Sequence, residues 1–191
     1  MIDAHPPEGT RRPRPGPGEP PHLRAATARP GVILRPLVES DEAELLRIHC
    51  AAEVVRWWGH PAEGFPWTDE PDSTRLTIEV EGAVAGLIQF TEELEPTYRH
   101  ASIDLFVDPA HHGRGVGTLA VGLLVRYLID VLGHHRITID PAAANAAAIR
   151  TYEKVGFRAV GVMRSYERDM DRGGWHDGLL MELLAGEEET P

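Results

Sequence analysis

A run of alternating glycines is the part of the sequence with the clearest chemical meaning. Gly113, Gly115 and Gly117 lie between residues 102–107, which alternate as a strand would, and a long apolar segment typical of a helix. Glycine lets backbone N–H groups approach a ligand closely, and a helix start adds N–H donors and a partial positive charge. This combination predicts a site for a phosphate or pyrophosphate group.

Three other interpretations of these glycines are weaker. A P-loop requires Gly-Lys-Ser/Thr, and this segment has no lysine. A dinucleotide fingerprint fits better, because Gly115, Gly117 and Ala120 match it and Asp140 follows about 20 residues later. That fingerprint starts at the end of a strand, however, whereas residues 108–114 intervene here. A glycine loop without any ligand is disfavoured by the regular spacing at a helix start.

The composition predicts one globular domain with an acidic surface. The chain has 191 residues, 42% of them hydrophobic, and a formal net charge of −11. Residues 1–30 carry five arginines and three acidic residues, so residues 31–191 carry −13. Such a charge repels nucleic acid and favours cationic ligands, although it also simply increases solubility.

Other classes of site and location are disfavoured by what the sequence contains. Cys50 is the single cysteine, which excludes an intrachain disulfide and a cysteine-based metal site. The histidines lack metal-ligand spacing beside carboxylates, so we expect no metal. No apolar run approaches membrane-spanning length, and the N-terminal region lacks the apolar core of a secretory signal. We therefore expect a cytoplasmic protein, as a monomer or homodimer.

The pattern divides the chain into a flexible Pro/Arg-rich leader (1–30), a folded domain (31–184) and an acidic tail (185–191). A helix is predicted after Ser40, its expected N-cap, and another from Asn145 to Val155. The tryptophan-rich segment after the first helix is predicted to be a loop. Further elements are a helix over 118–132 and strands over 32–37, 76–80, 83–90, 102–107, 136–140, 157–167 and 175–184.

Two motifs together resemble the GCN5-related N-acetyltransferases. Residues 112–117 read His-Gly-Arg-Gly-Val-Gly, similar to the acetyl-CoA-binding pattern Gln/Arg-x-x-Gly-x-Gly/Ala, with His112 in the Gln/Arg position. Residues 145–157 match the pattern Asn-x-x-Ala-x-x-x-Tyr-x-x-x-Gly-Phe. The resemblance implies the α/β fold of that family, a mixed central β-sheet flanked by helices, and acetyl-CoA as cosubstrate.

The resemblance also implies which residues bind the cosubstrate. They are Leu105, Phe106, Val107, His112, Gly113, Arg114, Gly115, Val116, Gly117, Thr118, Asn145, Ala148 and Tyr152. In the family a tyrosine at the position of Tyr152 protonates the departing CoA thiolate. A phenol titrates near pH 10 and a thiol near pH 8.5, so the phenol is protonated and able to donate. Without the motifs, Tyr152 would be a core residue and Asn145 a helix cap.

A narrower resemblance concerns the acceptor. Trp57-Trp58-Gly59, Asp104 within a strand and Asp140-Pro141 are similar to the aminoglycoside 6'-N-acetyltransferases, and siderophore-pathway acetyltransferases share parts of this pattern. The implied substrate is a small polycationic antibiotic. Carboxylates would bind its ammonium groups and tryptophans its sugar faces. The candidate substrate-binding residues are Trp57, Trp58, Glu92, Glu93, Asp104 and Asp140; alternatively, the tryptophans are core and the glutamates a solvated loop.

The predicted mechanism is direct acyl transfer. Asp104 lies between apolar neighbours in its strand, where a carboxylate requires an interaction partner or a functional role. It is the candidate base, directly or through water. Backbone N–H groups at the end of strand 102–107 would polarise the thioester carbonyl. Cys50 belongs to neither motif, so no acyl-enzyme is expected. Acetylation of a protein N-terminus or a siderophore precursor, and a non-catalytic acyl-CoA-binding module, remain alternatives; the presence of Asp104 and Tyr152 disfavours the module.

Overall fold

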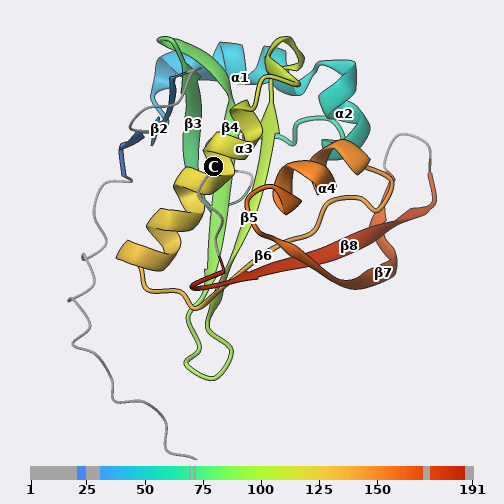
Figure 1. Cartoon of the computed structure of the whole chain (residues 1–191). Helices are drawn as coiled ribbons and strands as arrows, with labels where there is room; N and C mark the ends of the chain where they lie inside the picture. The colour runs from blue at the N-terminus through green and yellow to red at the C-terminus, as the bar shows by residue number, and fades with distance from the viewer. Residues whose placement is uncertain (1–20, 25–30, 69, 71, 170–172, 188–191) are drawn as a thin grey trace, which may run out of the picture.

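A single mixed β-sheet organises the chain (Figure 1). The computed structural model describes residues 21–24, 31–68, 70, 72–169 and 173–187. The sheet has eight strands in the order β1-β2-β3-β4-β5-β6-β8-β7; β5 and β6 are parallel and the other neighbours are antiparallel. The strands are β1 Leu23–Arg24, β2 Val32–Pro36, β3 Thr74–Val80, β4 Ala83–Glu93, β5 His100–Val107, β6 Arg136–Ile139, β7 Arg158–Arg168 and β8 Trp175–Leu184.

Helices cover both faces of this sheet. They are α1 Glu42–His49, α2 Ala52–Trp58, α3 Val116–Arg126 and α4 Ala146–Glu153; η1 Glu39–Asp41 and η2 Pro109–His111 are short 3₁₀ turns, and η3 Tyr127–Val131 is a π-helical turn that extends α3. The predicted α/β class with a mixed sheet between helices is confirmed. In the described part of the chain, no helix is both long and apolar enough to span a membrane.

The two faces of the sheet carry separate apolar clusters. Ile103 and Leu105 of β5 pack with Leu124 of α3 in the larger cluster, which also contains Tyr152 of α4. Phe106 of β5 belongs instead to the cluster of α1 and α2. Because successive side chains of a strand point to opposite faces, this alternation fixes which side of the sheet each residue of β5 and its partners serves.

The β3–β4 hairpin turns at residues 81 and 82, between the two predicted strands. Glu81 and Gly82 both have positive φ, 52° and 84°, as a tight hairpin turn requires. Further along β4, a Cβ at Gly86 would lie only 2.2 Å from the carbonyl oxygen of Phe106. The absence of a side chain at Gly86 therefore lets β4 and β5 approach closely.

The first helix differs from the prediction at its start. Ser40 does not cap it; it lies in η1, and Asp41 stands before the first residue of α1. Asp41 is buried, and its carboxylate accepts hydrogen bonds from Arg35 at 2.6 and 2.9 Å and from the Thr77 hydroxyl at 2.8 Å. Burial opposes ionisation, but these hydrogen bonds outweigh it and lower the pKa of Asp41. A contact with the sheet, rather than a local cap, thus determines where this helix begins.

Two further segments differ from the sequence prediction. Residues 52–58 form α2, where a loop was predicted, so Trp57 and Trp58 end a helix. Leu23 and Arg24, within the predicted leader, form β1 beside β2, and Leu23 packs against the larger apolar cluster. The rest of the leader lies outside the described residues, apart from Pro21 and His22.

Candidate active site

The parallel strands β5 and β6 separate soon after they meet. They are paired only at Ala101–Ile137 and Ser102–Thr138, after which β6 ends at Ile139 and β5 continues to Val107. Past this point, side chains rather than a neighbouring strand form hydrogen bonds with the backbone groups of Leu105 that face this side. The Leu105 carbonyl accepts a hydrogen bond from the Trp58 indole at 3.2 Å, and the Leu105 N–H donates to the Asp104 carboxylate at 2.9 Å. Both polar groups of Leu105 therefore face away from β4, on the side where the strands part.

The glycine loop continues directly from β5. The side chain of Asp108 accepts from the Ala110 N–H at 2.8 Å and also binds Arg47 of α1. The imidazole of His112 donates to the Val107 carbonyl at 2.9 Å, because a carbonyl oxygen can only accept. These contacts fix both ends of the turn that leads into α3.

The loop fits a diphosphate group. Gly113 and Gly115 have φ of 71° and 80°, and a Cβ on either would meet no described atom within 4 Å. Gly115 is the N-cap of α3 and, in the described structure, no side chain caps this helix. The first N–H groups of the helix, at 116–118, consequently have no helical acceptor. A Cβ at Gly117 would lie 3.4 Å from the Thr151 side chain, so α3 and α4 are in close contact here; binding of the cosubstrate by Gly117 stays a prediction.

Replacement of Gly115 by aspartate is expected to abolish measurable acetyl-CoA binding, because it places a carboxylate beside the diphosphate and a side chain on a left-handed backbone. Isothermal calorimetry measures the affinity. Gly82→Asp is the matched control, because Gly82 also has positive φ, at 84°, and open space around it but lies in the β3–β4 turn. A folded Gly115→Asp protein with wild-type affinity would contradict the assignment of the loop.

Asp104 lies on the open side of β5, opposite Ile103 and Leu105. Its side chain is accessible to solvent, yet protein atoms surround the carboxyl closely enough that desolvation is the main cause that raises its pKa to about 8. The neighbouring carboxylate of Asp140 is the second cause, and Glu70 and Glu167 contribute in the same direction. Four carboxylates from separate parts of the chain thus converge on one region, which suits a cationic acceptor.

Sequence reasoning found two of these four carboxylates. Asp104 and Asp140 were candidates. Glu70, which precedes β3, and Glu167, which belongs to β7, were not.

In the described part of the chain, no group of three or more His, Cys, Asp or Glu residues is arranged to hold a metal ion.

Tyr152 of α4 is buried in the larger apolar cluster and packs 6.3 Å from the ring of Phe157. Desolvation raises the pKa of its phenol, and the carboxylates of Asp104 and Asp140 raise it further. The hydroxyl is therefore protonated throughout the neutral range and able to act as a proton donor.

Asn145 and Ala148, the other candidates on this motif, are engaged with each other. The side-chain oxygen of Asn145 accepts from the Ala148 N–H at 3.2 Å and caps α4. The helix-cap role considered for Asn145 is therefore observed. Any contact of this pair with the cosubstrate stays a prediction.

A bulge in the β7–β8 hairpin brings Tyr166 to the site. The pairing shifts between Met163 and Glu167, where Ser165 has a φ of 50° and its N–H donates to the Asp177 carboxylate at 2.8 Å. A hydrogen bond with Asp140 is the main cause that raises the pKa of Tyr166 to about 12, followed by desolvation. The pattern of the sequence gave no indication of Tyr166, because its position depends on this bulge.

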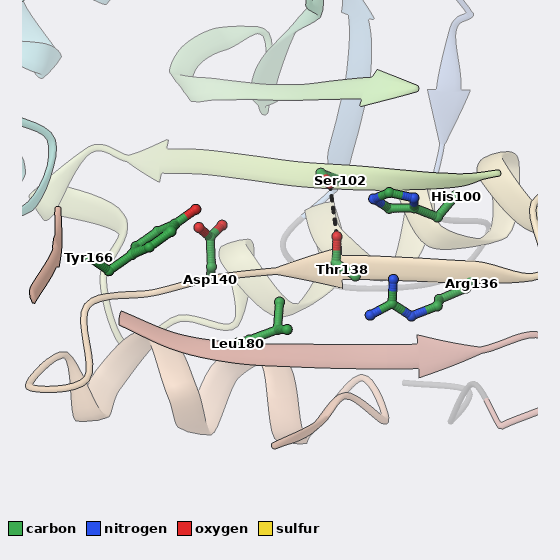
Figure 2. A pocket seen from close by; sticks show the side chains of 7 residues that line it. All are labelled: His100, Ser102, Arg136, Thr138, Asp140, Tyr166 and Leu180. Carbon is green, nitrogen blue, oxygen red and sulfur yellow. Dashed lines mark hydrogen bonds between the residues drawn. The ribbon is translucent and has the colours of Figure 1, made fainter. Parts of the chain in front are cut away.

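These residues border a pocket on the open face of the sheet. Figure 2 shows Tyr166 and Asp140 at one end and His100 and Arg136 at the other. The pocket has a volume of about 370 Å³ and is lined by His100, Ser102, Arg136, Thr138, Asp140, Tyr166 and Leu180.

The candidate glutamates lie on opposite faces of the sheet. Glu93 pairs with His100, which lines the pocket, whereas Glu92 pairs with Ala101 of the buried face. The carboxylate of Glu92 binds the buried His134 ring at 2.6 Å. The structure therefore does not bring Glu92 to the pocket, and we omit it from the proposed substrate site.

The two tryptophans have different surroundings. Trp58 packs edge-on against Phe106, with 5.1 Å between ring centroids, and is partly buried in the α1–α2 cluster. The Arg56 guanidinium lies 4.6 Å from the ring centroid of Trp57. Trp58 thus combines a packing role with a hydrogen bond to Leu105, next to the candidate base.

Comparisons with known proteins agree with the family that the two sequence motifs resemble. The model of the acetyltransferase (GNAT) family matches residues 39–157. Spermidine N(1)-acetyltransferase of Escherichia coli (strain K12) is 28% identical over 139 residues, which are 68% of this chain and 74% of that protein.

Solved structures show the same similarity. Aminoglycoside acetyltransferase AAC(6')-Ib in complex with coenzyme A is 25% identical, with a TM-score of 0.66 over 81% of this chain and 95% of that chain. Mycobacterium smegmatis RimJ in complex with CoA-disulfide has a TM-score of 0.70 at 23% identity, over 87% of this chain and 86% of that chain, a likeness that concerns the fold alone. The family inferred from the two sequence motifs is confirmed: the chain belongs to the acetyltransferase (GNAT) family and is an acetyl-CoA-dependent N-acetyltransferase.

Proposed function

We propose that the protein acetylates the 6'-amine of aminoglycosides and thereby confers resistance to them. The observation that carries this proposal is the convergence of Asp104, Asp140, Glu70 and Glu167 on one side of the parted strands β5 and β6. Glu70 already lies 3.6 Å from Arg75, and Glu167 lies 3.5 Å from His176. An acceptor with several ammonium groups adds positive charge beside Asp104 and Asp140, whereas a neutral or acidic acceptor does not.

Each step of the transfer has a candidate group in the chain. Acetyl-CoA supplies an activated acetyl group as a thioester. The amides of 113–118 hold its diphosphate. The Leu105 N–H already donates to Asp104, so another backbone N–H at the end of β5 stabilises negative charge that develops on the acetyl oxygen. Asp104 accepts the proton that the ammonium must lose before the nitrogen can attack, and its raised pKa makes it a stronger base than an ordinary aspartate. Tyr152 donates a proton to the departing sulfur.

A linear polyamine is the second candidate acceptor. It is supported by the similarity to spermidine N(1)-acetyltransferase of Escherichia coli, and an acidic site also suits spermidine. The aminoglycoside proposal is supported by the similarity to AAC(6')-Ib and by the Trp57-Trp58 and Asp140-Pro141 sequences.

Thiol release from acetyl-CoA, measured with kanamycin, spermidine and a peptide with a free N-terminus, tests these candidates. We expect turnover with kanamycin, and NMR of the product should show the acetyl group on the 6'-nitrogen. The Michaelis constant for kanamycin should rise with salt, because ions screen charges over about 10 Å at 0.1 M. Acetylation confined to a 3-amine or a hydroxyl would refute the proposed position, and activity on peptides without activity on aminoglycosides would refute the substrate class.

A further inference from the structure

The pocket has two chemically different ends. Asp140 and Tyr166 form the acidic end. Asp104 does not line the pocket itself, but its carboxyl interacts with that of Asp140. The opposite end is formed by His100, Ser102, Arg136 and Thr138. We propose that these four residues, the hydroxyl-binding end, bind hydroxyl groups of the acceptor and so select a hydroxylated amine such as an amino sugar over a linear polyamine. The inference rests on the proposed function, because it assumes that the reacting amine lies at the acidic end.

Arg136 makes the hydroxyl-binding end unfavourable for a second ammonium group. Its Nε donates to Glu182 at 2.7 Å, which leaves the terminal nitrogens of the guanidinium as further donors. Arg136 and Asp140 are four residues apart along the chain, or about 13 Å at the rise of a strand. A linear polyamine with one ammonium at Asp104 that extended along β6 would cover these donors with methylene and ammonium groups, neither of which accepts a hydrogen bond.

The ion pair with Glu182 also argues against an anion as the natural ligand of this end. The charge of Arg136 is already balanced by a carboxylate at hydrogen-bonding distance, with both side chains about one third accessible or less (29% and 32%). Arg136 therefore acts here as a hydrogen-bond donor in a neutral pair rather than as an unpaired cation.

Ser102, Thr138 and His100 supply the acceptors that a hydroxyl group also needs. The Ser102 and Thr138 hydroxyls are 2.8 Å apart, joined by the dashed line in Figure 2. The Thr138 hydroxyl also donates to the Ala101 carbonyl at 3.4 Å, so Ser102 donates to Thr138 and keeps its oxygen lone pairs for a ligand. His100 donates from Nδ1 to the Tyr98 carbonyl at 2.8 Å, which leaves Nε2 of the neutral ring as an acceptor.

The size of the pocket agrees with a ligand of few rings. Its volume of about 370 Å³ is near the lower limit for small-molecule sites, roughly 300–1,000 Å³. Leu180 provides an apolar surface against which a ring can pack. Because the two ends are about 13 Å apart, more than one ring is needed to reach both. An aminoglycoside with its amine at the acidic end and the hydroxyls of a further ring at the other accounts for the polar groups at both ends.

Binding of kanamycin and spermidine to the CoA-saturated protein, measured by calorimetry, tests the inference without requiring turnover. The wild type should bind kanamycin more tightly than spermidine. Thr138→Val, which keeps the shape but removes the hydroxyl, should weaken kanamycin binding about fivefold and change spermidine binding less than twofold. Arg136→Glu should weaken kanamycin binding and strengthen spermidine binding, shifting the ratio of the two affinities by about tenfold or more.

Arg24→Glu is the matched control for the charge change, because Arg24 is exposed in β1 at the other edge of the sheet. The inference is overturned if the wild type prefers spermidine, if Thr138→Val changes neither affinity, or if Arg24→Glu shifts the ratio as far as Arg136→Glu does. Selective kanamycin binding without thiol release would support the inference and refute the proposed function. Kanamycin acetylation, with an unchanged ratio of kanamycin to spermidine affinity in Thr138→Val and Arg136→Glu, would support the proposed function and refute the inference.

Discussion

Replacement of Asp104 by asparagine is expected to lower turnover about 10²–10⁴-fold, because asparagine keeps the size of the side chain but cannot accept the proton of the ammonium. Affinity for acetyl-CoA should change little, since the diphosphate loop lies beyond the end of β5. Steady-state thiol release and calorimetry separate the two effects. Asp130→Asn, on the exposed surface of the π-helical turn, is the control.

The pH dependence follows from the raised pKa of Asp104. With a pKa of about 8, the carboxyl gains its basic form as pH rises through that value. We expect kcat/KM of the wild type to increase across this range and the step to be missing in Asp104→Asn. A wild-type profile in the variant, with unchanged turnover, would exclude Asp104 as the base.

The same shift implies that Asp104 destabilises the fold when it is ionised. In the unfolded chain an aspartate titrates near 3.9, whereas the folded value is about 8. The cost of ionisation is absent below about pH 4 and grows as pH rises toward 8. Asparagine carries no such cost, so Asp104→Asn should raise the melting temperature more at pH 8 than at pH 5. An equal change at both values would show that the carboxyl is not perturbed by its surroundings.

Tyr152→Phe is expected to lower turnover about 10²–10⁴-fold while leaving acetyl-CoA affinity largely intact, because it removes a positioned proton donor but keeps the buried ring. Tyr127→Phe is the matched control, since Tyr127 packs against the same apolar cluster, 6.4 Å from the ring of Phe90 on the side of α3. Wild-type turnover in Tyr152→Phe would return Tyr152 to a packing role alone.

The sequence predicted the parts of the site that depend on local geometry. The glycines at 113 and 115 were informative because both have a left-handed backbone, which favours glycine, and because a glycine at a helix start leaves open space for a ligand. Asp104 was found for a similar reason, since a carboxylate between the inward-facing Ile103 and Leu105 must lie on the other side of its strand.

Contacts between distant segments determine what sequence reasoning missed. Tyr166 reaches Asp140 through a bulge that Asp177 supports from the neighbouring strand. Glu92 was predicted to bind the substrate for a simpler reason, because the predicted strand stopped at residue 90. Strand β4 continues to Glu93, and its alternation would have placed the two glutamates on opposite faces.

The crystal structure of the complex with CoA and kanamycin is the most direct test of the proposed site. We expect the diphosphate on the amides of 113–118 and the 6'-nitrogen within hydrogen-bond distance of the Asp104 carboxylate, directly or through one water. Kanamycin bound elsewhere, or bound with its 6'-nitrogen away from the parted ends of β5 and β6, would contradict the proposal that Asp104 prepares this amine for acetylation.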